Sequence, residues 1–450
     1  MKLDLPHIEI YYPYSKQYHE FLATTFSGEA SLCKPLAIVC PKTHTDIVDF
    51  VKLANKVHIP FTVYGGGLSS LCIHNNMVCL ALNKYYNQVK LVESDTGYLV
   101  HIQGGAKIGQ ILSILDTVGY HIPVGVSPLP GIGLVTRGGI GHLARSEGLT
   151  LDYIQKIRFI AANGEELNLS TTGDDIELWN AVRGSAPRFG VVSEVVLQAV
   201  PNNKVILATF STDIKVLNNW LCRVDKLDNN LSASLVLGSN SQITYNPVLF
   251  GYVVNQNTEE SAFRQINNFI YEVSTSYYYK WHNVPQLHNY ANMPAFDVPQ
   301  EQLSEQISQY FPFVKSYLIK NEHLKNLSHV LIKAIKDAPN QYCRIDLQHM
   351  GGKVATINNG SVFNGRDADW NLVVTGFAVN IDEGDAAVMW VNNILQQLEA
   401  AICSVYSVEI RNNRPETEKE LNLAFGDSLN KLHSLITKYD PKGLLQHYPL

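Results

Sequence analysis

Residues 125–142 read GVSPLPGIGLVTRGGIGH, and this glycine-rich stretch decides what the chain can fold around. A second glycine loop, VYGGGLS, lies earlier, at residues 63–69. Glycine lets backbone N–H groups approach an anion without side-chain obstruction, and it tolerates the positive φ angles that such cradles need. Two bare-backbone loops in one chain therefore predict a large phosphorylated ligand, and we expect a dinucleotide held along its length.

The glycine content separates these loops from ordinary turns. A three-glycine loop such as 65–67 is by itself more often a tight turn than a ligand site. The second stretch changes that balance, because seven glycines fall within residues 125–148, against an ordinary usage of about 7%. The pattern is not the Rossmann fingerprint, since no GxGxxG opens a helix after a first strand, and the Walker lysine motif is missing too.

Composition narrows the class of protein. The chain has 450 residues, 46% of them hydrophobic, so it is long enough for two domains with separate cores. Its formal net charge is −6 and it has no basic stretch, which excludes a nucleic-acid partner. No apolar run is long enough for a membrane span, and the first residues do not resemble a signal peptide. The seven scattered cysteines predict reduced thiols and no metal site. We expect a cytoplasmic enzyme that acts on a small molecule.

The pattern of predicted secondary structure changes at Pro201. Before it, short strand-like runs alternate with amphipathic helices, and Asn163-Gly164 is a strong hairpin signal. After it, longer strand-like runs predict an antiparallel sheet, at 207–210, 234–237, 248–253 and 372–377. Helices are predicted at 261–273, 322–338, 386–401 and 431–439. This order of elements is typical of an α+β domain.

Several further segments follow the glycine loops in a fixed order. They are LWNAVRG at 178–184, FGVV at 189–192, KSYL at 315–318, GG at 351–352, SVFNGR at 361–366, FGDSLNKL at 425–432 and KYDP at 438–441. Together with the loops, this series resembles the vanillyl-alcohol oxidase superfamily of PCMH-type FAD-linked oxidoreductases, most closely its berberine-bridge-enzyme-like branch. The resemblance covers nearly the whole chain.

The resemblance implies a fold and its division. The expected fold is α+β, with a two-part FAD-binding domain of PCMH type and an α+β substrate domain built on an antiparallel sheet. The FAD-binding domain would occupy 1–201, with its core at about 32–201, and the substrate-binding domain would occupy 202–404. Residues 405–450 would form a C-terminal segment that returns to the FAD domain.

Carried over residue by residue, the resemblance implies FAD as the cofactor. The first loop would cradle the pyrophosphate, and the second would line the isoalloxazine and the ribityl chain. The implied contacts are Tyr64, Gly65, Gly66, Gly67, Leu68 and Ser69 in the first loop, Ser127, Pro128, Gly131, Gly133, Gly141 and His142 in the second, and Val192 toward the adenine half. A structural role is the alternative for His142.

Two departures from the family concern the attachment of the flavin. The family usually tethers FAD through a histidine in the first loop and a cysteine in the second, and here those positions hold Leu68 and Ser127. Leucine has no nucleophile, and serine is not known for this attachment. The resemblance therefore implies non-covalent FAD. The second loop is also one residue shorter between Pro128 and Gly138, which leaves the electron acceptor open between O2 and another oxidant.

The segment Tyr406-Ser407-Val408-Glu409 stands where relatives carry a tyrosine base. In this register Glu409 occupies the base position, with Tyr406 as an alternative proton donor or acceptor. A glutamate buried beside a flavin would have a raised pKa and could act as a general base. The competing interpretation is a salt bridge from Glu409 to Arg411 or Arg414.

Alternation along a strand suggests a pocket wall in the second domain. Trp370, Leu372 and Val374 would point to one face, as in the pocket of the relatives, although the same pattern fits core packing. Gln348, just before the Gly351-Gly352 turn, is a further polar candidate for the pocket.

The implied function is oxidation of a small organic, specialised metabolite. A base would take a proton while hydride passes to flavin N5, and O2 or another acceptor would reoxidise the flavin. An alternative is the same fold with structural FAD, catalysing a non-redox cyclisation or isomerisation. A cofactor-free binding protein is a third possibility.

Overall fold

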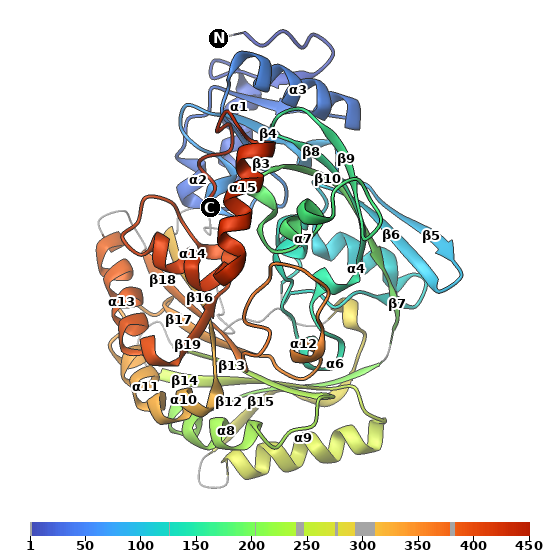
Figure 1. The fold of residues 1–450 in the computed structure, drawn as a ribbon. Helices are drawn as coiled ribbons and strands as arrows, with labels where there is room; N and C mark the ends of the chain where they lie inside the picture. Colours follow the sequence, from blue (N-terminus) through green and yellow to red (C-terminus); the bar gives the residue numbers. More distant parts are fainter. Residues whose placement is uncertain are drawn as a thin grey trace.

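Residues 2–125, 127–202, 204–239, 247–274, 278–292, 311–378 and 383–450 are described by the computed structural model shown in Figure 1. The first glycine loop follows the edge strand of a small sheet with the order β1-β2-β4-β3. Its strands are β1 (Glu9–Tyr11), β2 (Ala37–Cys40), β4 (Val78–Ala81) and β3 (Phe61–Tyr64). On helix α3 (His44–Val57), Phe50 packs against Phe61 of β3 with the ring centroids 5.3 Å apart. This apolar contact anchors the strand from which the loop leaves.

A five-stranded antiparallel sheet completes the amino-terminal half. Its order is β5 (Val89–Ser94), β6 (Gly97–Gln103), β10 (Gly190–Gln198), β8 (Ile154–Ala161) and β9 (Glu166–Leu169). Asn163-Gly164 forms the turn between β8 and β9, and Gly164 has a φ of +92°, which confirms the predicted hairpin. The second glycine stretch lies between β6 and β8, among the helices α4 (Ile108–Asp116), α5 (Ile132–Arg137), α6 (Ala144–Glu147) and, after β9, α7 (Ile176–Ser185).

The carboxy-terminal half is built on one large antiparallel sheet. Its order is β15 (Tyr279–His288), β12 (Val205–Asp213), β14 (Pro247–Asn255), β13 (Leu231–Ser239), β17 (Arg344–His349), β18 (Trp370–Ala378), β16 (Phe311–Ile319) and β19 (Ile402–Val405). Helices α8 (Leu217–Val224), α9 (Glu259–Ser274), α11 (Ser328–Lys336) and α13 (Gly384–Gln397) accompany it. The predicted α+β class with an antiparallel sheet is therefore confirmed.

The two faces of this sheet differ in what they contact. Trp220 of α8 lies 5.8 Å from Phe210 of β12, and a Cβ on Gly376 of β18 would meet the backbone of Ala387 in α13 at 2.7 Å. These contacts define a helix-covered face. Figure 1 shows α8 and α9 on the side of the sheet away from the amino-terminal half. The opposite face is therefore the one turned toward the glycine loops.

The last segment of the chain packs against the amino-terminal half. Helices α14 (Thr417–Phe425) and α15 (Leu429–Tyr439) lead into a tail whose Leu444 carbonyl accepts a hydrogen bond from the Phe61 N–H at 3.1 Å. The Tyr448 hydroxyl accepts one from the Val63 N–H at 2.9 Å, directly before the first glycine loop. Directly after α15, Asp440 forms a buried ion pair with Arg188. The exact domain boundaries, at 201 and 404, stay a prediction.

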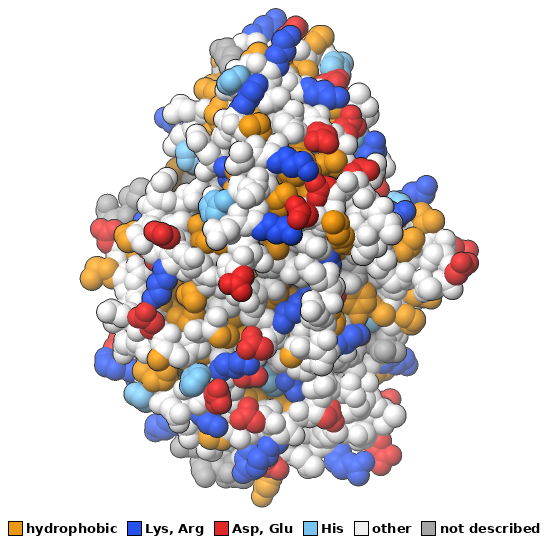
Figure 2. Space-filling model, in the orientation of Figure 1, with side chains coloured by type: hydrophobic (Ala, Val, Ile, Leu, Met, Phe, Trp, Pro, Cys, Tyr) orange, Lys and Arg blue, Asp and Glu red, His pale blue; other side chains and the backbone are white. Residues whose placement is uncertain are grey.

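The surface of the protein carries charges of both signs, and its cysteines are unpaired. Lys, Arg, Asp and Glu side chains are interspersed over the face that Figure 2 shows. None of the helices described in the structure combines the length and the apolar character needed to cross a membrane. All seven cysteines are free thiols, with Cys40, Cys72, Cys79 and Cys343 buried and Cys222 exposed.

Candidate cofactor and active site

The two glycine loops lie in direct backbone contact. A Cβ on Gly66 would meet the Gly131 nitrogen at 2.3 Å, and a Cβ on Gly131 would meet the Gly66 nitrogen at 2.6 Å. No side chain fits at such a separation, so both positions require glycine for this close approach. The fold thus brings together residues 64–69 and Gly131, which the sequence had assigned to one ligand.

The first loop presents a row of backbone donors. The N–H groups of Gly65, Gly66, Gly67 and Leu68 donate no hydrogen bond to any other described residue. Gly67 has a φ of +80°, a conformation that turns successive amides toward one side. Ser69 ends the row, because its side chain accepts from the Leu71 N–H at 3.2 Å and so caps the following turn. Unsatisfied amides in a concave glycine loop are an anion site, and a pyrophosphate fits it.

The tether positions hold side chains without the usual chemistry. Leu68 is half-buried in the first loop and ends in methyl groups. Ser127 is half-buried as well, and its hydroxyl accepts from the Leu129 N–H at 3.3 Å, so it acts as a turn residue. Pro128 and Gly133 are exposed. None of these four residues is a histidine or a cysteine, the residue types that the family uses to attach the flavin.

The end of the second loop reaches toward the large sheet. A Cβ on Gly141 would overlap the Val124 carbonyl oxygen at 1.6 Å, so the loop doubles back tightly on itself here. Next to it, His142 is buried with its ring centroid 6.2 Å from that of Tyr252 on β14. Val192 lies on β10, where its carbonyl oxygen would meet a Cβ on Gly104 at 2.5 Å. Of these residues, His142 is the one that contacts the large sheet, whereas Val192 packs within the amino-terminal half.

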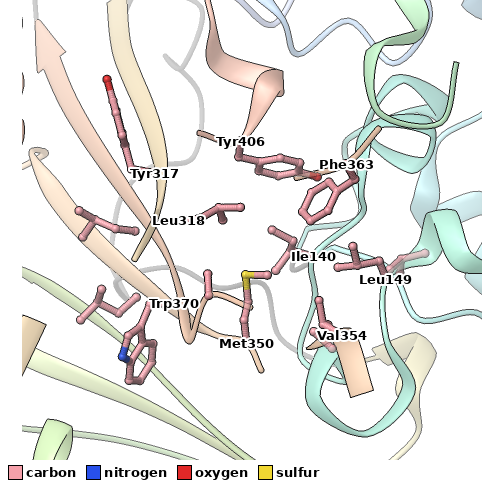
Figure 3. Close-up of a cluster of buried hydrophobic side chains, with 14 of the residues drawn as sticks. Ile140, Leu149, Tyr317, Leu318, Met350, Val354, Phe363, Trp370 and Tyr406 are labelled. Carbon is pink, nitrogen blue, oxygen red and sulfur yellow. The ribbon is translucent and has the colours of Figure 1, made fainter. Parts of the chain in front are cut away.

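Tyr406 joins the end of β19 to the second glycine loop. Its hydroxyl accepts a hydrogen bond from the Gly139 N–H at 2.9 Å, and its ring lies 5.9 Å from that of Phe363. Figure 3 shows both rings meeting above Ile140, with Leu318 and Met350 on the sheet side. Burial raises the pKa of Tyr406 to about 12, although the Gly139 amide and the charge of Arg137 favour the phenolate. Tyr406 is therefore a proton donor at neutral pH.

Glu409 is half-buried, in a short turn three residues after Tyr406. Burial raises the pKa of this carboxyl, against the opposing positive charges of Arg411, Arg137 and Lys315. The competing interpretation, a salt bridge to Arg411 or Arg414, is not supported at contact distance. Arg411 lies 2.7 Å from the carboxylate of Glu29 instead, and within the described ranges no basic nitrogen comes within 4.0 Å of Glu409. Among the described residues the Glu409 carboxylate therefore has no ion-pair partner at contact distance.

The predicted pocket wall lies on the helix-covered face. Trp370, Leu372 and Val374 are fully buried in the main hydrophobic core, and the Trp370 indole donates to Asn321 at 2.9 Å. In Figure 3 the Trp370 side chain points away from Ile140 and Tyr406. Their placement corrects the pocket-wall prediction in favour of core packing, the alternative that the strand pattern had left open. The physical reason is that a strand alternates, so the neighbouring positions face the other way.

Gln348 lies on the face turned toward the glycine loops. It pairs across the strands with Asn371, whose side-chain amide donates to it at 2.8 Å. The hydroxyl of Ser316 in turn donates to Asn371 at 2.6 Å. Asp346 is on the same face, two residues before Gln348, and is buried. This polar row could have been found from the sequence by taking the residues that alternate with Trp370, Leu372 and Val374.

Arg137 is a further residue that the sequence analysis missed. It is the only charged side chain within the stretch 125–142, and it ends α5 between two glycine pairs. Its Nε donates to the Gly133 carbonyl at 3.0 Å, which folds the side chain back along the helix. A charged residue inside a glycine run that otherwise lacks one was the available signal.

Comparison with known proteins agrees with this geometry. A family model for an FAD binding domain matches residues 35–170. An FAD-linked oxidoreductase of Dictyostelium discoideum is 27% identical over 430 residues, which cover 92% of this chain and 88% of that protein. Among solved structures, wild-type BBE-like 1 of Physcomitrella patens has a TM-score of 0.81 at 16% identity, covering 99% of this chain and 97% of that chain. CrmK, a flavoenzyme involved in shunt product recycling in caerulomycin biosynthesis, has a TM-score of 0.85 at 17% identity over 98% of each chain.

The matched segment contains the loop of free amides and the loop that touches it. Curated relatives over nearly the full chain are named FAD-linked oxidoreductases, and the solved structures share the fold. Residues 35–170 therefore lie within an FAD-binding domain of PCMH type, and the chain is an FAD-linked oxidoreductase with the fold of the berberine-bridge-enzyme-like proteins.

Proposed function

We propose that this protein oxidises a small, hydroxylated organic metabolite of specialised metabolism, using FAD that is not covalently attached. The observation that carries the proposal is the hydrogen bond between Tyr406 and the Gly139 amide, because it joins the predicted base segment to the predicted cofactor loop. The biosynthetic setting named for the structurally similar CrmK supports the choice of a specialised metabolite.

The chain's own residues supply binding and proton transfer in this proposal. The free amides of Gly65 to Leu68 hold the pyrophosphate, and the Gly66–Gly131 contact closes the cradle. FAD, when bound, supplies a two-electron oxidant that accepts hydride at N5, and O2 or another acceptor takes the electrons afterwards. Glu409 takes the proton that leaves the substrate's O–H or N–H group as the C–H bond gives up its hydride. Tyr406, protonated at neutral pH, donates a hydrogen bond to the reacting oxygen or nitrogen.

The substrate side of the site is the polar row on the large sheet. Ser316, Asn371 and Gln348 form a connected chain of hydrogen bonds on the face turned toward the glycine loops. Buried amide and hydroxyl groups orient a ligand through its own hydrogen-bonding groups and penalise one that lacks them. This row supports a substrate that carries hydroxyl groups.

Anaerobic addition of candidate alcohols and amines to the FAD-loaded protein tests the redox function. We expect a substrate to bleach the flavin absorbance band, because two electrons reach the cofactor and no acceptor removes them. Admission of O2 then restores the band if O2 is the acceptor. Conversion of a substrate with the band unchanged throughout would instead support a non-redox cyclisation or isomerisation on structural FAD.

Acid precipitation of the purified protein tests the attachment of the flavin. Because Leu68 and Ser127 replace the two tethering residues, we expect all of the yellow colour to remain in the supernatant and none in the pellet. L68H and S127C are the matched variants, since each returns one side chain that the family uses. Flavin retained in the pellet of the unmodified protein would contradict the non-covalent proposal.

A further inference from the structure

The carboxy-terminal tail, residues 444–448, covers the open edge of strand β3. This strand is the last in the order of its described sheet, so its outer edge has no neighbouring strand to pair with. The Leu444 carbonyl accepts from the Phe61 N–H at 3.1 Å, and the Tyr448 hydroxyl accepts from the Val63 N–H at 2.9 Å. The tail therefore supports β3 as far as Val63, where the first glycine loop begins.

The same tail contacts the chain where it leaves the first glycine loop. The Nε2 of His447 lies 2.8 Å from the carbonyl oxygen of Leu71, which follows Ser69 by two residues. A carbonyl oxygen only accepts, so Nε2 carries the proton and donates it. Burial lowers the pKa of His447 to about 4, so the ring is neutral near pH 7. Tyr448 and His447 thus hold the two ends of the loop, with the free amides of residues 65–68 between them.

The position of His447 is unfavourable for a histidine in one respect. Its side chain is buried, and its Nδ1 has no hydrogen-bond partner among the residues that the structure describes. A buried acceptor without a donor lowers the stability of the fold. An apolar side chain would avoid this cost but could not donate to Leu71. The hydrogen bond to Leu71 therefore explains the residue type.

The tail itself is held in place by polar contacts on its other side. The side-chain amide of Asn412 donates to the carbonyls of Gln446 at 3.0 Å and His447 at 2.9 Å. The buried carboxylate of Asp440 accepts from the Leu444 N–H at 2.7 Å. These bonds fix the tail's backbone at both of its ends, so its side chains can fix the loop.

We propose that His447 and Tyr448 are positioning residues for FAD, which hold the two ends of the first glycine loop so that its free amides converge on the pyrophosphate. The inference rests on the role given above to the amides of residues 65–68. Donors that are already arranged bind an anion more tightly, because the ligand does not have to order the loop.

Binding of FAD and of ADP to the FAD-free protein tests the proposal. FAD is followed by flavin fluorescence, and ADP, which has the pyrophosphate but no flavin, by calorimetry. We expect H447L and Y448F each to raise the Kd of FAD about tenfold, the size of one lost hydrogen bond, and that of ADP by the same factor. H447Q keeps a side-chain N–H for the Leu71 carbonyl and should bind both ligands nearly as the wild type does.

The matched control is Q446A, because Gln446 is exposed and the backbone carbonyl that Asn412 contacts stays in place. Urea titration of each FAD-free variant gives its free energy of unfolding. Lower stability with both Kd values unchanged would show a structural role only and overturn the proposal. Equal losses of affinity in H447L and H447Q, or a loss for FAD without one for ADP, would overturn it too.

Y448F keeps its ring and tests the same loop if H447L does not fold. No substrate is present in these measurements. A protein that shows the expected affinities and yet oxidises no substrate would therefore contradict the proposed function alone.

Discussion

Replacement of Glu409 by glutamine is expected to lower kcat/KM by roughly 10²- to 10⁴-fold while FAD stays bound, since that is the usual contribution of a positioned general base. Glutamine has the same shape but cannot accept the proton. The loss is measured with a substrate that bleaches the flavin anaerobically, and the flavin content of each preparation is taken from its absorbance. The flavin content then distinguishes a variant that lacks the base from one that has lost its cofactor.

The direction in which kcat/KM changes with pH provides a second test of Glu409 as the base. Because burial raises the pKa of Glu409, its carboxylate becomes protonated at a higher pH than an ordinary glutamate. A base must be ionised, so kcat/KM should fall as the pH drops through this raised pKa, and E409Q should lack that limb.

Y406F is the companion variant, because it removes only the hydroxyl that accepts from Gly139. We expect a smaller loss than in E409Q. Activity of E409Q near that of the wild type, together with a severe loss in Y406F, would instead assign the base to Tyr406.

Replacement of Lys315 by methionine is expected to destabilise the protein by about 3–5 kcal/mol, the cost of leaving buried charge without its partner. Lys315 is 1% exposed, and its ammonium lies 2.7 Å from Glu420 and 3.0 Å from Glu416. Glu420 lies on α14 and Glu416 directly precedes this helix, so the cluster links the carboxy-terminal segment to β16. The free energy of unfolding, measured by urea titration of the FAD-free protein, reports the effect.

A lysine on the surface provides the control for this variant. Lys333 pairs with Asp337 one helical turn away, and its side chain is 75% exposed, so K333M should cost less than about 1 kcal/mol. In the triple variant K315M/E416Q/E420Q, part of the lost stability should return, because the uncompensated carboxylates are gone. Equal losses in K315M and K333M would show that the cluster contributes no more than a surface pair.

An FAD-binding segment could be predicted from the sequence because an exposed backbone follows from glycine content alone. Glycine at 65 to 67 leaves a row of amides exposed, which composition alone indicates, and glycine at 66 and 131 allows the two loops to touch. The prediction of non-covalent FAD is local in the same way, since it depends only on the identities of Leu68 and Ser127, and the acid-precipitation experiment tests it.

The pocket wall could not be assigned in the same way. A strand pattern shows which residues share a face but not which face meets the cofactor, and Trp370, Leu372 and Val374 proved to face the helices. The choice between a base and a salt bridge for Glu409 was likewise open, because Arg411 found its partner in Glu29, which is distant in the sequence.

The sequence by itself predicted a dinucleotide cradle in the two glycine loops and placed Leu68 and Ser127 where the family's tethering residues would stand, because glycine content and residue identity are local properties. Only the tertiary structure decided which side chains surround that cradle. The polar row of Ser316, Asn371 and Gln348 and the contact of Tyr406 with Gly139 depend on strand register and on packing between distant segments. Such contacts are set by burial over the whole fold, and no local pattern encodes them.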